Sequence, residues 1–225
     1  MEYFEYRNVV IEAPYSPEAE AYRKLELNIA MMSIDKKTQV IQCTSPTPED
    51  GKTTTAINLA AVYAEKKKKV IILDFDLRRP KIHRAFHCVN DKGFYDYITD
   101  DVDYHDLIVH HESNIDVLLT GRHFSFPHIV LESHKTADLI EHLRKEYDVI
   151  VIDTPPVLSV TDSVIISNYV DGIVYVVAYN KTKKEDAKTA LTQLQKNNAN
   201  VLGIVFANVD VRKTKSYYTY YSDNK

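Results

Sequence analysis

The chain has 225 residues, 44% of them hydrophobic, which is enough to bury the core of one domain. Its net charge of −4 gives no general attraction to nucleic acid or to an anionic membrane, so a dedicated DNA-binding protein is disfavoured. The 2 cysteines make no disulfide framework, and without a signal peptide or a long apolar run we expect a soluble, cytoplasmic protein that does not insert into a membrane.

The amino-terminal part predicts an arm followed by a helix. Residues 1–16 include Pro14 and are expected to be extended. Pro17 suits the first position of a helix, and the segment of about 17–33 is amphipathic. Its apolar residues at helical spacing are Ala21, Leu25, Ile29 and Met32. This helix either covers an edge of the sheet or contacts another subunit.

Residues 44–55, TSPTPEDGKTTT, are typical of a phosphate-binding loop between a buried strand at 40–43 and a helix at 53–65. Backbone N–H groups and a helix N-terminus bind phosphate well. Lys52 would reach the β- and γ-phosphates, and the Thr53 hydroxyl would bind Mg²⁺. Pro46 replaces the first glycine of the usual pattern. The expected nucleotide-binding residues of the loop are Pro48, Glu49, Asp50, Gly51, Lys52, Thr53 and Thr54.

Two aspartates, Asp74 and Asp76, follow an apolar strand at 70–73. Residues i and i+2 of an extended chain point to the same face, and a doubly wound sheet binds ligands at the carboxyl ends of its strands. One carboxylate can therefore hold magnesium while the other polarises an attacking hydroxyl. The alternative is a polar loop that caps the next helix.

The rest of the core alternates between helices and strands. The pattern predicts short helices near 81–86 and 93–98, a strand at 115–119 and a helix at about 129–147. A strand at 148–153 ends in Asp153, which can orient magnesium through a bound water. A helix at 161–169, a strand at 172–178, a helix at 183–197 and a strand at 201–206 follow. We expect an α/β fold, a doubly wound and mostly parallel sheet with helices on both faces, over residues 1–209.

The carboxyl-terminal tail, residues 210–225, differs in composition from the core. It contains the paired tyrosines Tyr217, Tyr218, Tyr220 and Tyr221. Tyrosine also suits an edge strand, but the pairs lack its alternation of period 2. Hydroxyl groups at a chain end are accessible acceptors for a modification.

Four features follow one another along this chain: the phosphate loop, the motif Asp74-x-Asp76-x-Arg78, Asp153 and the tyrosine tail. In these features the chain resembles bacterial tyrosine kinases of the capsule and exopolysaccharide type over nearly its whole length. The resemblance implies ATP as phosphoryl donor, Mg²⁺, and autophosphorylation of the tail in trans. It implies catalytic roles for Lys52, Asp74, Asp76 and Asp153, with Asp74 favoured as the base, and a metal site of Thr53, Asp74, Asp76 and Asp153.

The resemblance also implies partners. A family motif for contacts between subunits places Glu20 and Arg23 at the interface of a possible ring, but Glu26 stands where the motif has a second arginine. The asparagine of the last strand, implied to recognise adenine, is Asn208, one place later than usual. The expected activator is a membrane-embedded regulator of polysaccharide chain length, which would recruit the kinase to the inner face of the membrane.

Two other functions fit part of the pattern. A partitioning or positioning ATPase of the ParA or MinD type has a related loop, but it carries a lysine where this chain has Thr47, and it lacks the tyrosine cluster. A nucleotide-binding scaffold without kinase activity is the second alternative. The set of Lys52, Thr53 and the three aspartates favours the kinase over the scaffold.

Overall fold

The computed structural model describes residues 6–32 and 37–209, and these contain one sheet of 7 strands in the order β3-β4-β2-β5-β1-β6-β7. The neighbours pair in parallel, except that β3 is antiparallel to β4. The strands are β1 (Val40–Thr44), β2 (Val70–Asp74), β3 (Ile108–His110), β4 (Ile115–Leu118), β5 (Val149–Asp153), β6 (Gly172–Ala178) and β7 (Val201–Ala207). The predicted α/β fold is confirmed.

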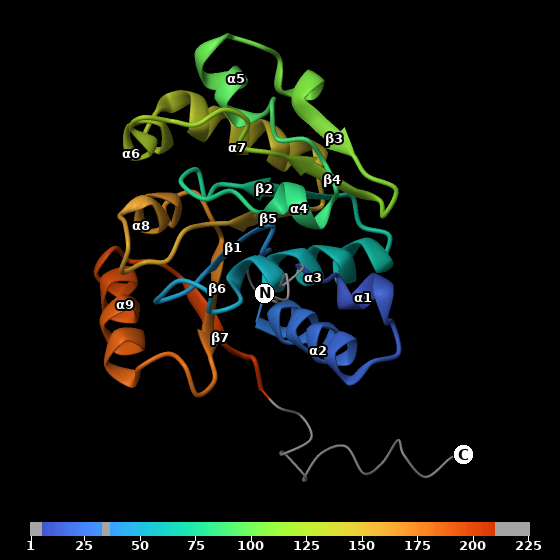
Figure 1. The fold of residues 1–225 in the computed structure, drawn as a ribbon, viewed down its shortest axis with the longest axis vertical. Helices are drawn as coiled ribbons and strands as arrows, with labels where there is room; N and C mark the ends of the chain where they lie inside the picture. The colour runs from blue at the N-terminus through green and yellow to red at the C-terminus, as the bar shows by residue number, and fades with distance from the viewer. Residues whose placement is uncertain (1–5, 33–36, 210–225) are drawn as a thin grey trace, which may run out of the picture.

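Helices cover both faces of this sheet (Figure 1). One face carries α1 (Val9–Glu12), α2 (Pro17–Met32), α3 (Lys52–Glu65) and α4 (Ile82–Ala85). The other carries α5 (Phe94–Thr99), the 3₁₀ helix η1 (Tyr104–Leu107), α6 (Pro127–Leu131), α7 (His134–Glu146), α8 (Asp162–Ile166) and α9 (Lys184–Lys196). Every residue of β1, β2, β5 and β6 is buried, which explains why these strands are mostly apolar in sequence.

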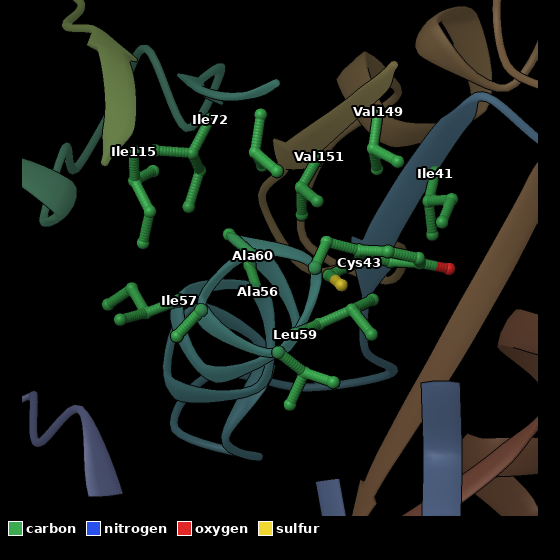
Figure 2. Close-up of a cluster of buried hydrophobic side chains, with 14 of the residues drawn as sticks. Ile41, Cys43, Ala56, Ile57, Leu59, Ala60, Ile72, Ile115, Val149 and Val151 are labelled. Atoms are coloured by element: carbon green, nitrogen blue, oxygen red, sulfur yellow. The ribbon is translucent and has the colours of Figure 1, made fainter. Parts of the chain in front are cut away.

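Helix α3 is held firmly against the middle of the sheet. Figure 2 shows Ala56 and Ala60 of α3 close to side chains of the central strands, among them Ile72 and Val151. The small alanines let the helix approach the sheet, and the isoleucine and valine side chains are fully buried. Burying each such side chain contributes about 1.5–3 kcal/mol relative to exposure. The amino end of α3, which carries Lys52 and Thr53, therefore has a rigid support.

The predicted extended arm at residues 1–16 is wrong at residues 9–12, which form α1. The Asn8 side chain caps this helix by accepting from the Ile11 N–H. Val10 is buried, and its N–H donates to Asn58 Oδ1 at 3.1 Å. Tertiary contacts with α3 therefore hold a turn that is too short for its periodicity to show.

The middle of the chain also departs from the prediction. The single helix expected at 129–147 is two helices, α6 and α7, because Ser133 breaks the run and caps α7 by accepting from the Thr136 N–H. The short antiparallel strand β3 was not predicted. Its 3 residues are too few for a pattern of period 2 to stand out.

Helix α2 begins at Pro17 as predicted and ends, within the described residues, at Met32. Its polar side chains pair with the end of α3. The Arg23 guanidinium donates to both carboxylate oxygens of Glu65, at 2.9 and 2.8 Å, and Glu26 pairs with Lys66. Glu26 is only 4% exposed, so the acid in place of the family's second arginine is part of the contact between α2 and α3.

Candidate active site

The carboxyl ends of β2 and β5 bring two of the predicted aspartates together. Asp74 and Asp153 are direct neighbours in the register of these adjacent parallel strands. Asp76 follows two residues after Asp74 and is also buried. The amino end of α3 lies at the same edge of the sheet, where Lys52 contacts two of the aspartates.

Lys52 lies between two carboxylates. Its Nζ is 3.0 Å from Asp76 Oδ2 and 3.6 Å from Asp153 Oδ1, and the Thr53 hydroxyl donates to Asp153 Oδ2 at 2.7 Å. Burial alone would lower the pKa of Lys52, but the two carboxylates raise it above its ordinary value, so the ammonium stays charged. Burial raises the pKa of Asp153, and the Lys52 charge opposes that shift. The loop lysine, the loop threonine and two of the aspartates thus form one buried cluster.

Asp74 is held differently. Its Oδ2 accepts from the backbone N–H groups of Lys81 and Ile82, both at 2.9 Å, so it anchors the start of α4. Burial and the neighbouring Asp153 raise its pKa from an ordinary value of 3.8 to about 8. The helix-cap interpretation of this aspartate is therefore confirmed, and its role in the site stays a prediction. A carboxyl group with a pKa near the working pH is also suited to general base catalysis.

The donor set fits a magnesium ion that arrives with phosphates. Asp74 Oδ1 and Asp153 Oδ1 are buried and have no hydrogen-bond partner within the described residues, and such oxygens call for a ligand. In the same part of the chain, no three His, Cys, Asp or Glu side chains form a metal site by themselves. Magnesium usually takes one or two carboxylates and completes its shell with phosphate oxygens and water. Asp153 Oδ1, the Thr53 hydroxyl and the nearby Asp76 carboxylate are the candidates to hold it, and Asp74 Oδ1 remains available to a reacting group.

Gly51 shapes the loop immediately before α3. Its φ is +94°, a conformation that favours glycine, and a Cβ atom there would lie 2.9 Å from the Ala207 Cβ. The end of β7 therefore packs directly against the loop. Asn208, the next residue, is exposed and has a φ of +58°. The order of the strands thus brings the predicted adenine-binding residue to the same edge as the phosphate loop.

Asp50 stabilises the loop from inside. Its Oδ2 accepts from the N–H and the hydroxyl of Thr47, at 2.9 and 2.8 Å, and its Oδ1 accepts from the Thr182 hydroxyl at 2.7 Å. Asp50 is fully buried. These contacts satisfy the carboxylate within the protein, which supports a role in loop shape for Asp50.

Sequence reasoning missed the residues that hold this loop from the far end of β6. Lys181 Nζ donates to the carbonyl oxygens of Pro48 and Glu49, at 3.3 and 3.1 Å, and Thr182 binds Asp50. Lys181 and Glu49 lie 132 positions apart in sequence, and no local pattern marks the contact. Asp162, which pairs with Arg78 of the predicted motif, was missed for the same reason.

This combination of features defines a P-loop nucleotide-binding protein: a buried strand, a loop ending in Gly-Lys-Thr, a helix, and two neighbouring strands that end in aspartate. The family model described as an AAA domain matches residues 39–201. The septum site-determining protein MinD of Pyrococcus horikoshii, in a complex with Mg-ADP, has the same fold, with a TM-score of 0.64 and 23% identity over 75% of this chain and 70% of that chain.

The particular family follows from more similar proteins. The tyrosine-protein kinase YwqD of Bacillus subtilis is 35% identical over 96% of this chain and 91% of its own length. The structure of the chimerical protein CapA2B2 has a TM-score of 0.85 and 35% identity over 88% of each chain. The chain therefore belongs to the family of bacterial tyrosine-protein kinases. As a kinase of the P-loop class it uses ATP.

Four of the predicted residues, Tyr217, Tyr218, Tyr220 and Tyr221, lie outside the described residues. Within the described part, none of the helices is both long and apolar enough to cross a bilayer.

Proposed function

We propose that this chain transfers the γ-phosphoryl group of ATP to the tyrosines of its own tail, in trans between copies. Residues 1–209 are the kinase domain and residues 210–225 carry the acceptors. The observation that supports this most strongly is the cluster at the start of α3, where Lys52 and Thr53 contact Asp76 and Asp153. Each of these side chains has a use in phosphoryl transfer, which depends mainly on positioning and charge neutralisation.

Lys52 and the loop would bind the phosphates. When ATP binds, Lys52 exchanges its carboxylate partners for oxygens of the β- and γ-phosphates, and the backbone N–H groups at the start of α3 add their dipoles. Magnesium, when bound by Thr53, Asp76 and Asp153 with Asp74 nearby, neutralises phosphate charge. The exposed Asn208 would contact the adenine.

The tyrosine hydroxyl oxygen then attacks the γ-phosphorus while the bond to ADP breaks. Its proton passes to a carboxylate, for which we favour Asp74 because burial raises its pKa to about 8. Asp74 Oδ2 is fixed by two backbone N–H groups, so Oδ1 is the atom that would accept the proton.

We place this kinase in the control of capsule or exopolysaccharide synthesis and export. The support is the order of the four sequence motifs together with the likeness to the CapA2B2 chimera and to YwqD. Its activator would be the cytoplasmic end of a membrane-embedded regulator of polysaccharide chain length. That partner would bring the kinase to the inner face of the membrane.

Incubation of the purified chain with γ-labelled ATP and Mg²⁺ tests the reaction. We expect phosphotyrosine in the tail, more of it when the cytoplasmic segment of such a regulator is added, and none when Tyr217, Tyr218, Tyr220 and Tyr221 are all replaced by phenylalanine. Release of free phosphate without phosphotyrosine would identify the ATPase switch instead. Binding with neither product would identify the scaffold.

Self-association is the second part of the proposal. Glu20 is half exposed on α2 and lies 3.6 Å from Arg23, which is also shared with Glu65 of its own chain, so a contact between subunits would add to these pairs or replace them. Each phosphate adds about −1.5 to −2 charges to a tyrosine. We therefore expect phosphorylated tails to repel each other and the assembly to become smaller. Light scattering of the protein before and after full phosphorylation measures this, and an unchanged mass would exclude it.

A further inference from the structure

An ion pair with one buried partner, between Arg78 and Asp162, lies next to the cluster around Lys52 without belonging to it. Arg78 Nε donates to Asp162 Oδ2 at 2.9 Å, and Nη2 donates to Oδ1 at 3.2 Å. Asp162 is the first residue of α8 and its side chain is completely buried, whereas the Arg78 side chain is 39% exposed. Two parallel hydrogen bonds from a planar guanidinium fix both distance and angle, which a single contact does not.

This pair connects the two loops that carry the aspartates around Lys52. Arg78 lies two residues after Asp76, in the turn that follows β2. Asp162 begins the helix after the loop that leaves β5 at Asp153. The turn after β2 is held on its other side by Asp74, which binds the N–H groups of Lys81 and Ile82. Within the turn, Asp76 Oδ1 accepts from the Arg79 N–H at 3.1 Å.

We propose that Arg78 and Asp162 form a latch that fixes the position of Asp76 relative to Asp153 around Lys52, and that both are positioning residues for phosphoryl transfer. This inference rests on the proposed kinase function. Asp76 and Asp153 carry like charges on either side of one ammonium group. When Lys52 turns to the phosphates, its ammonium group no longer balances the repulsion between Asp76 and Asp153. The latch then keeps the loop after β2 and the loop after β5 at a fixed separation.

Loss of the latch should affect the rate of phosphoryl transfer and the affinity for nucleotide differently. The phosphate loop and α3 do not include Arg78 or Asp162, so loss of the latch leaves the nucleotide-binding surface in place. The carboxylates, however, must meet the reacting groups with high precision, and a displacement of about 1 Å can cost roughly 100-fold in rate. Loss of the latch therefore lowers the rate at saturating ATP far more than it weakens nucleotide binding.

The test uses the full chain and the variants Arg78→Met, Asp162→Asn, the double variant and Arg78→Lys. We expect each single variant to form phosphotyrosine about 10- to 100-fold more slowly at saturating Mg·ATP, with the dissociation constant of a fluorescent ADP analogue changed by less than about 3-fold. The double variant should be about as slow as the slower single one, since the two residues act as one unit. Arg78→Lys keeps the positive charge but cannot make the two parallel hydrogen bonds of the guanidinium. Its transfer rate should therefore lie between those of Arg78→Met and the unmodified chain.

A matched control exists at the opposite edge of the sheet. Arg144 and Asp171 form the same forked pair, with contacts of 2.9 and 3.0 Å, and Asp171 also accepts from the Gln39 and Val40 N–H groups at the amino end of β1. Arg144→Met and Asp171→Asn should lower the Tm without slowing transfer in the folded protein. These variants show what a stability defect alone does to the assay.

Three outcomes would overturn the latch. They are transfer rates in Arg78→Met and Asp162→Asn within about 3-fold of the unmodified chain, additive losses in the double variant, or a loss of nucleotide affinity as large as the loss of rate. The double variant has no unpaired buried charge, so it keeps the test valid if a single variant folds poorly. Absence of phosphotyrosine in the unmodified chain would instead refute the proposed function.

Discussion

Replacing Lys52 by methionine is expected to reduce labelling of the tail by roughly 100-fold or more, the size of effect seen when one preorganised group that stabilises a developing charge is removed. Methionine keeps the length of the side chain and its packing but removes the ammonium group that lies between Asp76 and Asp153. Phosphotyrosine formed from γ-labelled ATP by the variant and by the unmodified chain, at equal protein concentration, measures the loss.

Stability should fall in the same variant. Without the ammonium group, Asp76 and Asp153 are left buried without the positive partner that Lys52 provides, and removal of one partner of a buried pair typically costs about 3–5 kcal/mol. Lys52→Arg retains the charge and is the matched control. It should recover stability while transfer stays low, because a forked guanidinium does not fit the place of a compact ammonium.

The Lys52→Met protein also tests transfer between copies. It retains the tail, so a small amount of unmodified kinase should label it, and the same protein with the four tail tyrosines changed to phenylalanine should stay unlabelled. Labelling of Lys52→Met when it is incubated without unmodified kinase would contradict the role of this lysine. If only the unmodified chain in this mixture becomes labelled, and Lys52→Met does not, transfer in trans is contradicted.

Replacing Asp74 by asparagine should abolish transfer and at the same time stabilise the protein. The asparagine Oδ1 can still accept from the Lys81 and Ile82 N–H groups that hold α4. The substitution removes a buried carboxyl group whose pKa is raised from 3.8 to about 8 by burial and by Asp153. A gain of about 1 kcal/mol corresponds to roughly 2–4 °C in Tm for a protein of this size.

The pH dependence of that gain has a definite sign. Between pH 3.8 and about pH 8, folded Asp74 holds a proton that the unfolded chain releases, so its contribution to stability falls as the pH rises. The stability difference between Asp74→Asn and the unmodified chain should therefore be small near pH 4, grow towards pH 8 and then level off. Thermal unfolding in buffer free of metal and nucleotide measures it. A difference independent of pH would show that the titration of Asp74 is not the cause.

Much of the site could be read from local sequence because its chemistry lies where strands end. Asp74 and Asp153 each follow an unbroken apolar run, Asp76 comes two residues after Asp74, and Lys52 opens the helix that follows the loop after β1. Parallel strands of one buried sheet end at the same edge, so recognising the strands was enough to bring these residues together. Helix α2 was equally visible, because its 16 residues are long enough for the apolar spacing to repeat.

Elements too short to repeat a pattern could not be found in this way. Helix α1 has 4 residues and β3 has 3, and each depends on contacts with segments far along the chain. The break between α6 and α7 depends on one capping serine within a run that otherwise has helical spacing. In each case a tertiary contact or a single side chain outweighed the local preference.

What the sequence determined by itself was the kind of protein: a P-loop fold, a lysine and three aspartates at one edge of its sheet, and a tail rich in tyrosine. Only the tertiary structure decided how those residues are held. In the folded protein Asp74 binds the start of α4, and Lys52 pairs with Asp76 and Asp153. Thr182 donates to Asp50 inside the loop, and Asp162 pairs with Arg78. The physical reason is that burial and hydrogen bonding depend on neighbours in space, and Thr182 and Asp162 lie 132 and 84 positions from the residues that they bind.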